Sequence, residues 1–521
     1  MRSHGRGEPL IPHWKMKRHW YLPLLILPLT AYAQPSRLAE DVSYSAQLVG
    51  TAGSGSQAPF WFTNNRYGLG DAENGYAYLR ASLQRSTEAD RHRHWRLGYG
   101  ADAVVSTGMQ SHLVLQQLYA DVEWQALRLS VGQKERPLEL RDQQLSTGGM
   151  TTGINARPLP QVRLELPRFW SVPRTGGWLA LKAHVAYGAY TDNRWQRHFN
   201  DHDLRYLYTT GSLYHSKALF VRVGNVERFP LTLTGGLEMS CQFGGTGHNL
   251  RQRVGFGGPE YYDESLLDGV KSFWNALIPG GGDSNDGDVY SNREGNHLGS
   301  WHTRAELHGS GWSGAVYMDH FFEDQSQMFW QYGWKDKLWG FELTPPENPF
   351  LSNLVVEFVG TMDQSGAIYH DRTSTIPEQI SGCDQYYNNH IYGAWQHAGF
   401  VMGNPLLSSP IYNDRFGMSH NLMVYHSRIR AFHLGLSGQP SSQLGWRILY
   451  THEKSLGSYN APTPDPQKAN FLLLELTYKP RRLQGLALTA SYGHNDGKIL
   501  GNSNAAMLSV AYSGWIKHET R

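Results

Sequence analysis

The sequence predicts an all-β protein, namely a transmembrane antiparallel β-barrel of about 18 strands. The first observation is that apolar residues alternate with small or polar ones in many segments, for example 118–124 (LYADVEW) and 472–478 (LLLELTY). A period of two is typical of pleated strands that have one apolar and one polar face. Many short segments of this kind, separated by turns, indicate a barrel in a membrane. A soluble all-β protein with an apolar core is the alternative that alternation alone leaves open.

The N-terminus is the second observation. A basic stretch at 15–18 (KMKR) precedes an apolar run at 21–29, and the motif Ala-Tyr-Ala follows at 31–33. These three parts are typical of a secretory signal peptide. We therefore expect residues 1–33 to be cleaved after export and residues 34–521 to form a single outer-membrane barrel domain.

The third observation is that the rest of the chain has no long apolar stretch. The run at 21–29 is itself too short to cross a bilayer as a helix. Only helices and closed barrels satisfy their backbone hydrogen bonds in lipid, so a membrane location requires a closed barrel. The basic stretch also leaves open that translation starts at Met16, with residues 1–15 as an upstream extension.

The composition agrees with a barrel and excludes other classes. Aromatic residues make up 12% of the chain, including 17 Trp and 29 Tyr, and barrels use these residues in girdles at the membrane interfaces. A net charge of +2 argues against nucleic acid as a partner. The two cysteines, Cys241 and Cys383, exclude a disulfide framework and a cysteine-based zinc site. An oxidising compartment permits a bridge between them, but nothing requires it.

Alternation and turn residues then place nineteen candidate strands along the chain. They are 43–53, 75–86, 94–105, 114–124, 127–135, 159–169, 177–190, 205–224, 231–245, 297–308, 312–322, 336–345, 352–362, 388–402, 419–437, 443–454, 469–479, 485–495 and 504–516. Bacterial barrels normally have an even number of strands and keep all their short turns at one end. Both conditions are met if one candidate between 336 and 402 is not a barrel strand, which leaves 18.

The longest insertion, 246–296, predicts a short amphipathic helix. Apolar residues between Tyr261 and Leu277 recur at helical spacing, and three glycines at 280–282 end the segment. We expect this helix to pack on the barrel mouth or to fold into the lumen. The acidic residues that follow do not match a calcium-binding loop, because Gly287 is one position early. A solvated loop without a metal is the better interpretation.

Several short motifs resemble those of the capsule assembly Wzi-like outer-membrane proteins of the Bacteroidetes type. They are spread over nearly all of the expected mature chain: 53–55 (GSG), 58–62 (APFWF), 64–68 (NNRYG), 145–150 (LSTGGM), 155–161 (NARPLPQ), 295–300 (GNHLGS), 322–324 (FED), 338–340 (LWG) and 387–389 (YNN). The hydrophilic end after Trp515-Ile516 departs from the aromatic terminal residue of many outer-membrane barrels.

This resemblance implies an outer-membrane barrel of about eighteen strands with a lectin-like role. Such a protein holds capsular polysaccharide or exopolysaccharide at the cell surface and helps to organise it after export. The implied partners are therefore that polysaccharide, the lipid and lipopolysaccharide of the outer membrane, and the polysaccharide-export machinery. The resemblance does not supply the identity of the sugar.

Motifs for catalysis are missing from the sequence. It contains no G-x-S-x-G, no H-E-x-x-H and no phosphate-binding loop, and its 24 histidines are scattered. Glu323 and Asp324 are adjacent, so in a strand they would point to opposite faces. We predict a protein that is not an enzyme, with no catalytic residues, no cofactor and no metal, and keep a barrel-embedded hydrolase as the third alternative.

Charged residues fall at the polar phase of the candidate strands and are expected to face the lumen, because charge on the lipid face is costly. These residues are Arg80, Arg96, Asp102, Asp121, Glu123, Arg304, Glu306, Asp319, Glu357, Arg428, Arg430 and Glu475. Both signs interleave, which favours a network of ion pairs that plugs the lumen over a solute-selective channel. In this interpretation Ile429 lies on the lipid side, opposite to Arg428 and Arg430.

Sugar recognition needs flat aromatic faces beside planar polar groups. The expected loops offer such clusters, and the carbohydrate-binding candidates are Trp195, Asp192, Asn193, Trp330, Trp334, Tyr386, Tyr387, Asn388 and Asn389. An interfacial girdle is the alternative role for each aromatic residue. The leading hypothesis for function is a lectin-like surface protein for polysaccharide, and a diffusion channel or porin is the alternative.

Overall fold

The computed structural model describes residues 38–199, 206–252, 260–266, 269–278, 295–323, 328, 335–369, 380–383, 385–414 and 421–516. The expected signal peptide, 1–33, lies outside them. The barrel strands are β1 (Val42–Gly55), β2 (Ala77–Arg85), β3 (Trp95–Thr107), β4 (Leu113–Trp124), β5 (Leu127–Gln133), β6 (Pro160–Ser171), β7 (Leu179–Ala189), β9 (Leu213–Val223), β10 (Leu231–Phe243), β13 (Asn296–Gly309), β14 (Trp312–Glu323), β15 (Lys337–Thr344), β16 (Asn353–Gly360), β23 (Ile429–Ser441), β24 (Leu444–Gly457), β25 (Pro462–Tyr478), β26 (Leu486–Gly497) and β27 (Ser503–Ile516).

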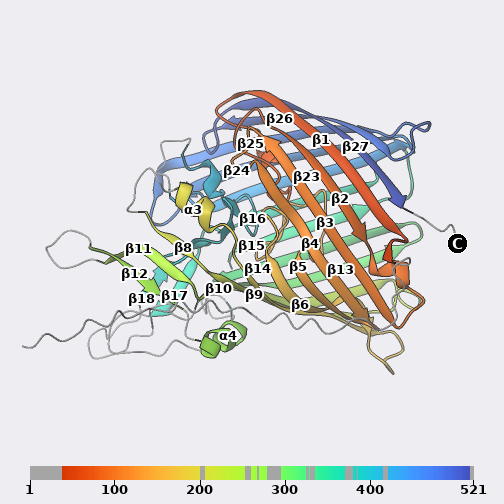
Figure 1. Ribbon diagram of the computed structural model, residues 1–521, viewed down its shortest axis with the longest axis horizontal. Coiled ribbons are helices and arrows are strands. Elements are labelled where there is room, and N and C mark those ends of the chain that lie inside the picture. Colours follow the sequence, from red (N-terminus) through yellow and green to blue (C-terminus); the bar gives the residue numbers. More distant parts are fainter. Residues whose placement is uncertain are drawn as a thin grey trace, which may run out of the picture.

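These strands form one 18-stranded sheet in which each strand pairs antiparallel with the next (Figure 1). The last strand, β27, pairs with β1 along its whole length, from Ile516 opposite Val42 to Ser503 opposite Gly55, and this closes the sheet. The predicted fold class, an all-β barrel of about 18 strands, is confirmed. Closure leaves the barrel sheet without an exposed edge.

The candidate strand 388–402 is not a barrel strand, and its removal from the list gives the even number. That segment instead forms two small hairpins, β19 (Asn388–Asn389) with β20 (Gly393–Ala394) and β21 (Gln396–His397) with β22 (Phe400–Val401). It lies in the long connection between β16 and β23. The sequence pattern of this segment was misleading because its aromatic residues, such as Trp395 and Phe400, are buried inside the lumen and not on one face of a strand.

The two ends of the barrel differ. The chain enters β1 and leaves β27 at one end, the turn end, where the connections between strands are no longer than 86–94. The opposite end, the loop end, carries the long connections, including 244–295 and 361–428. Figure 1 shows α3 beyond the loop end. Bacterial outer-membrane barrels have this asymmetry, with short turns in the periplasm and long loops outside.

The remaining elements belong to the connections. They are α2 (Phe60–Thr63), η1 (Thr87–Asp90), α3 (Asn193–Phe199), β8 (Tyr208–Thr210), β11 (Thr246–Gln252), β12 (Glu260–Ser265), α4 (Gly269–Leu277), β17 (Ser365–Tyr369), β18 (Ile380–Cys383) and η3 (Pro410–Tyr412). None of the helices among the described residues is long and apolar enough to cross a membrane.

The predicted helix in the long insertion is α4, and it packs outside the barrel, not in the lumen. Tyr187 Oη donates to Phe273 O at 2.8 Å, and the ring centroids of Phe243 and Phe273 lie 5.2 Å apart. The helix therefore covers the outer face of β7, β9 and β10 at the loop end. Its glycines and the acidic residues after it, at 280–294, lie outside the described residues.

The outer face of the barrel is apolar, as alternation predicts. Exposed aliphatic side chains cover it, among them Leu79, Leu118, Leu129, Val162, Leu219, Val316, Leu474 and Leu508. A belt of exposed aromatic side chains stands at the turn end: Trp95, Trp124, Trp170, Phe229, Trp312, Phe350, Tyr478 and Trp515. Trp95 and Trp124 lie opposite one another on β3 and β4, with ring centroids 6.1 Å apart. Such a belt is typical of a membrane–water interface.

Three connections fold back into the lumen and pack there as a plug. The plug consists of residues 56–76 between β1 and β2, residues 134–159 between β5 and β6, and residues 385–414 and 421–428, which both belong to the connection between β16 and β23. Its buried side chains form one hydrophobic core with inward residues of the strands, and include Phe60, Trp61, Phe62, Met150, Tyr386, Tyr387, Trp395, Phe400, Leu406, Leu407 and Tyr412. Phe60 stacks on Phe471 of β25 at 4.4 Å, and Tyr386 meets Phe321 of β14 edge-on at 4.7 Å.

The plug also meets β23 closely. A side chain at Gly435 would place its Cβ 2.6 Å from Leu145 O, so only glycine lets the backbones of plug and wall approach this far. Two residues earlier, His433 Nε2 lies 2.7 Å from the same carbonyl oxygen. The plug is thus held against strands on different sides of the barrel.

Candidate functional site

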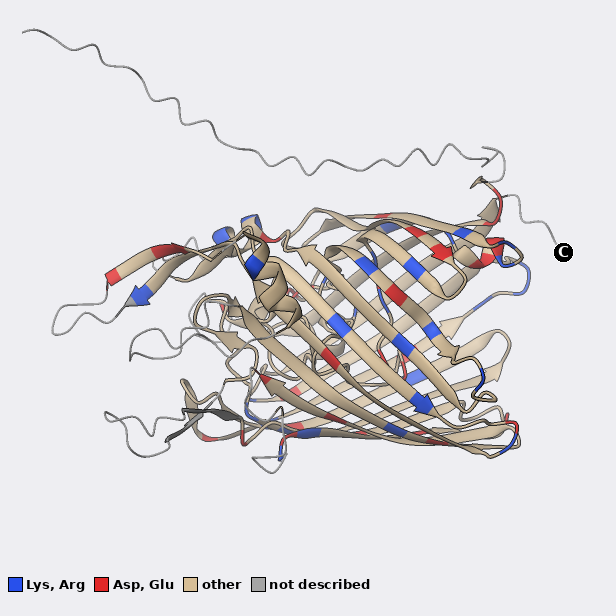
Figure 2. Ribbon diagram, turned by 90° about the horizontal axis from the view of Figure 1, so that it is seen from below, with Lys and Arg blue, Asp and Glu red and all other residues tan. Residues whose placement is uncertain are grey.

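Charged residues lie along the barrel strands (Figure 2), and those expected in the lumen mostly pair there. On β2 and β3, Arg80 lies 2.5 Å from Asp102 and 2.9 Å from Glu135 of the plug. On the neighbouring strand β4, Glu123 forms ion pairs with Arg96, Arg128 and Arg168 at 2.5–2.8 Å. Glu123 is therefore surrounded by cations, and Arg80 joins two carboxylates.

The other predicted lumenal residues are also brought into pairs. Asp121 lies 2.5 Å from Lys134 Nζ, and Arg304 lies 3.1 Å from Glu306 and 2.7 Å from Glu342. Glu475 lies 3.0 Å from Arg447. Arg447 and Glu342 occupy the polar phase of their strands, so the alternation could have predicted that both face the lumen. Lys134 and Glu135 close the candidate strand 127–135, but β5 ends at Gln133, and the sequence did not single them out as lumenal charges.

Arg428 and Arg430 are exceptions, and the expectation that they face the lumen is wrong. The register of β23 buries Ile429 and Ala431 inside the barrel and leaves Arg430 exposed on the outer face. Arg428 shares that outer face and lies over the ring of Tyr459 at 4.1 Å. Ile429 is inward because it packs in the plug core, where an apolar side chain is favoured.

Asp319 and Glu357 anchor the plug through Arg141, a residue that sequence patterns did not reveal. The three side chains are at most 2% exposed, and Arg141 forms an ion pair with Asp319 and lies 3.9 Å from Glu357. Glu357 also accepts hydrogen bonds from Ser146 Oγ, Thr147 N and Tyr317 Oη at 2.6–2.7 Å. Burial disfavours the charged guanidinium, yet Asp319, Tyr317 and Glu357 together raise the pKa of Arg141 above its usual value.

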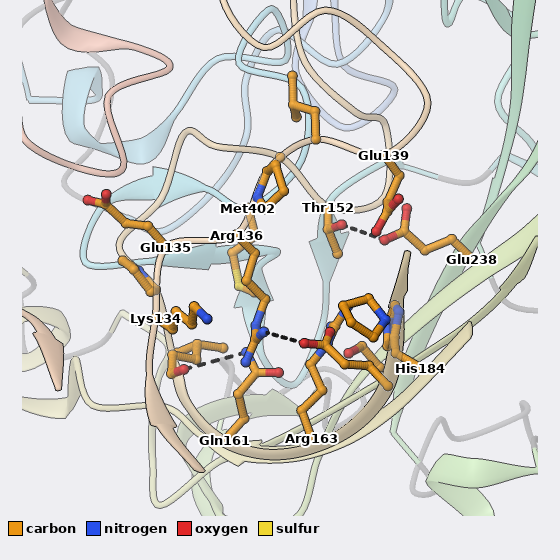
Figure 3. Close-up of a pocket in the computed structure, with 18 of the residues that line it drawn as sticks. Lys134, Glu135, Arg136, Glu139, Thr152, Gln161, Arg163, His184, Glu238 and Met402 are labelled. Atoms are coloured by element: carbon orange, nitrogen blue, oxygen red, sulfur yellow. Dashed lines mark hydrogen bonds and ion pairs between the residues drawn. The ribbon is translucent and has the colours of Figure 1, made fainter. Parts of the chain in front are cut away.

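A cavity of about 220 Å³ lies between the plug and the wall formed by β5, β6, β7, β9 and β10 (Figure 3). Thr152 and Met402 of the plug line one side, and Thr152 Oγ1 donates to Glu238 of β10 at 2.5 Å. Arg163 and His184 from the strands line the other side. The plug thus forms part of the cavity instead of blocking it.

The cavity wall is rich in cations. Arg128, Lys134, Arg136, Arg157, Arg163 and Lys182 line it, against the carboxylates Glu135, Glu139, Glu165 and Glu238. Glu165 is shared by three guanidinium groups, those of Arg163 at 2.6 Å, Arg136 at 3.6 Å and Arg128 at 3.7 Å. Burial and the neighbouring Arg163 lower the pKa of Arg136 to about 10.

Several buried nitrogen atoms in this wall have no partner within the part of the chain that the structure describes: the donors Arg136 Nε and Arg157 Nε, and His184 Nε2. Unpaired buried donors are costly, and guanidinium groups bind carboxylates and phosphates well. The geometry therefore suits a small anionic group, such as the carboxylate of an acidic sugar.

The sugar-binding candidates fall into three groups. Tyr386 and Tyr387 are completely buried in the plug core, and Asn388 and Asn389 hold its turns through bonds to Val424, Ile391 and Tyr392. Because the two tyrosine rings are buried, they offer no surface to a sugar ring, which corrects that expectation, and Asn388 and Asn389 are only partly buried. Trp330 and Trp334 lie outside the described residues.

The third group is on α3 at the loop end. Asp192 is buried and accepts hydrogen bonds from Gln196 and Gln396 at 3.0–3.1 Å, so it supports the helix instead of meeting solvent. Asn193 Oδ1 accepts from Gly211 N at 3.4 Å. Trp195 is half-buried, with its ring stacked on Phe199 at 4.8 Å. Trp195 and Asn193 therefore remain as surface candidates.

A buried histidine makes the plug sensitive to pH. His426 Nδ1 lies 2.9 Å from Ser455 Oγ, and burial lowers the pKa of its imidazole to about 4. The unfolded chain takes up this proton near pH 6.5, so it binds more protons than the folded chain between pH 6.5 and 4. Stability should therefore fall as the pH drops through this window, by up to about 3 kcal/mol.

The replacement His426→Gln should remove this part of the pH dependence, measured as the melting temperature of the detergent-solubilised protein between pH 7 and 4. His198→Gln, at an exposed position of α3, is the control and should leave the dependence unchanged. Parallel curves for His426→Gln and the unmodified protein would contradict the assignment.

Comparison with known proteins agrees with the fold. No protein-family model and no curated protein matches the chain. Among solved structures, the chain is similar to Wzi, an outer-membrane protein involved in group 1 capsule assembly in Escherichia coli and described as a carbohydrate-binding β-barrel. The TM-score is 0.53 at 14% identity, over 91% of this chain and 85% of Wzi.

Other solved structures are less similar. OccAB4 of Acinetobacter baumannii has a TM-score of 0.43 at 11% identity, over 92% of this chain and 100% of OccAB4. The outer-membrane protein OprD of Pseudomonas aeruginosa has a TM-score of 0.44 at 8% identity, over 92% and 96%. The class defined by the closed sheet, the apolar outer face and the likeness to Wzi is an outer-membrane β-barrel with 18 strands.

Proposed function

We propose that this protein binds capsular polysaccharide or exopolysaccharide at the cell surface and helps to organise it, without acting as an enzyme. The observation that carries the proposal is the plug, whose aromatic core fills the lumen against strands on several sides. Barrels of this size otherwise leave an aqueous channel. A plugged barrel that presents long loops is better suited to binding than to diffusion. The carbohydrate binding stated for Wzi, which has the same fold, supports it.

In this proposal the signal peptide 1–33 directs export, and the loop end faces the outside of the cell. Lipid and lipopolysaccharide surround the barrel, and the polysaccharide-export machinery supplies the glycan. The glycan meets the loop end, where α3 presents Trp195 beside the exposed cations Arg194 and Arg197. An aromatic face binds a sugar ring, and the cations favour acidic sugars. The cationic cavity next to the plug gives a second place where a sugar carboxylate fits.

The test is binding of purified acidic and neutral polysaccharides to the detergent-solubilised protein. We expect acidic polysaccharide to bind and Trp195→Ala to weaken binding about tenfold, because stacking of one aromatic ring typically contributes about 1 kcal/mol or more. Trp274→Ala removes an exposed tryptophan from α4 at the same end and serves as the control. Equal binding by all three proteins would exclude α3 as the glycan surface, and the absence of binding to every glycan would contradict the function.

A diffusion channel is the second candidate, and the partly exposed charges in the lumen favour it. Arg80, Arg447 and Glu475 keep 18–22% of their side-chain surface exposed in the lumen, which indicates water around them. Planar-bilayer recordings separate the two functions. A stable open conductance of the unmodified protein would support the channel, and silence would support the glycan-binding barrel.

A further inference from the structure

A straight row of cations crosses the outer face of the barrel near its loop end. It contains Lys337 on β15, Arg430 on β23, Lys454 on β24, Lys468 on β25 and Lys498 just after β26. We call these five residues the cation row. They come from segments up to 161 positions apart in the sequence, and only the pairing of the strands brings them together.

The strand register aligns the row. Lys337 pairs with Gly360, Gly360 with Arg430, Arg430 with Lys454, and Lys454 with Lys468. Lys498 N donates to Lys468 O at 2.8 Å, which extends the row by one strand. Neighbouring strands are about 4.8 Å apart, so the row is about 24 Å long.

The side chains of the row point away from the lumen. At least one neighbour of each cation along its strand is buried inside the barrel, for example Ile429 and Ala431 beside Arg430 and Ala469 beside Lys468. Arg430, Lys454, Lys468 and Lys498 are exposed, and Lys337 is half-buried. No ion pair joins any of the five to a carboxylate in the part of the chain that the structure describes. Asp496 is an exposed acidic residue on this face, and it pairs with Asn470, two positions from Lys468 toward the turn end.

An aromatic row marks the depth of these cations in the membrane. Two positions toward the turn end, Trp339, Phe358 and Phe432 lie side by side on the same outer face. The ring centroids of Phe358 and Phe432 are 5.2 Å apart. Two residues of a strand span about 7 Å. Aromatic belts sit at the level of the lipid headgroups, so Lys337 and Arg430, which stand next to these rings, lie at the outer edge of that level.

The row is confined to one side of the barrel. Near the loop end of β3 and β4, the paired outer residues are Val105 and Leu113, which are apolar and exposed. A general attraction to the membrane would need cations all around the barrel. A one-sided row at the headgroup level instead indicates a binding site for an individual lipid.

We propose that the cation row binds the phosphate groups of a phosphorylated glycolipid in the outer leaflet. Clusters of lysine and arginine next to a membrane recognise anionic headgroups, and arginine can hold a phosphate through two parallel hydrogen bonds. A row of five cations fits a headgroup with more than one phosphate. This interaction is separate from the glycan-binding surface on the loops, so either can fail without the other.

The experiment compares two triple variants of the full-length protein, purified from outer membranes. The row variant carries Arg430→Gln, Lys454→Gln and Lys468→Gln. The control variant carries Lys479→Gln, Arg481→Gln and Arg482→Gln, which removes three exposed cations from a connection at the turn end. We measure phosphorylated glycolipid retained per barrel by mass spectrometry, and binding to detergent micelles that contain lipopolysaccharide or its dephosphorylated form.

The row variant should retain and bind at least about tenfold less lipopolysaccharide than the unmodified protein, because each cation adds to the attraction. The control variant should match the unmodified protein. Dephosphorylated lipid should bind weakly to all three. Full retention by the row variant, or an equal loss in both variants, would overturn the proposal. Displacement of the lipid by millimolar inorganic phosphate would show a site for free phosphate instead of a lipid.

A further variant separates the loss of charge from a loss of folding. Arg430→Lys keeps the charge and should keep most of the binding, and the shift in gel mobility on heating reports whether each barrel is folded. If the row variant does not fold, the pair of Lys454→Gln with Lys468→Gln takes its place. The same loss is expected from that pair to a smaller degree, and unchanged lipid binding by a folded pair would again overturn the proposal.

Discussion

Removal of residues 386–426 should convert a silent barrel into a conducting one. This segment supplies the largest part of the plug core, including Trp395, Phe400 and Tyr412. The cut ends lie close together, because Gln364 Oε1 accepts from Tyr386 N and Gln364 Nε2 donates to Ser427 O. A short Gly-Ser linker can therefore join them without strain on β16 or β23. An 18-stranded barrel without its filling should leave an aqueous channel.

Single-channel recording in planar bilayers measures this effect. The control is removal of α4, which packs on the outer face of the barrel and should leave the lumen closed. The shift in gel mobility on heating and the circular dichroism of the β-sheet show whether each variant is folded. A folded variant that lacks residues 386–426 and still does not conduct would show that 56–76 and 134–159 are sufficient to close the lumen.

The second large effect is expected from Arg141→Met. Removal of this guanidinium leaves Asp319 and Glu357 buried without their main countercharge. Loss of one partner of a buried pair typically costs about 3–5 kcal/mol. The free energy of unfolding in detergent with urea should fall by this amount. Arg481→Met, at an exposed position in a turn, should change it by less than about 0.5 kcal/mol.

A double variant separates the ion pair from other effects of the substitution. Arg141→Met combined with Asp319→Leu removes this pair of charges, and an apolar pair of similar size is often tolerated. Glu357 still lacks Arg141, and His302 Nδ1, which lies 2.8 Å from Asp319, loses its partner, so only part of the stability should return. The double variant should therefore be more stable than Arg141→Met alone. If the two losses simply add, Arg141 and Asp319 are not energetically coupled and the plug is held by its hydrophobic core.

Much of the barrel was predictable from local patterns. Alternation in segments such as 118–124 predicted both the strand and its inward face, since a period of two assigns each side chain to one side. The requirement that all short turns lie at one end of the barrel also predicted that one candidate strand was not a barrel strand. The error at 388–402 arose because Trp395 and Phe400 are buried in a plug, where aromatic residues need no strand.

The candidate sites were less predictable. Arg80, Asp102 and Glu123 were expected in the lumen and lie there in ion pairs. Tyr386 and Tyr387 were predicted to bind sugar because the polar residues Asn388 and Asn389 follow them. The structure shows that these two asparagines hold the turns of the plug through hydrogen bonds. The outward position of Arg430 was missed because the segment before β23 belongs to the plug, and the face of a strand cannot be assigned where its start is misplaced.

By itself, the sequence determined the all-β class, the approximate number of strands and the inward face of most of them, because these properties depend on neighbouring residues. Only the tertiary structure decided that three connections fill the lumen, because the plug depends on contacts such as Arg141 with Asp319, which are 178 positions apart. The cation row has the same origin. Lys337 and Lys468 share one row only because the strands between them pair in a particular register, and no local pattern records that register.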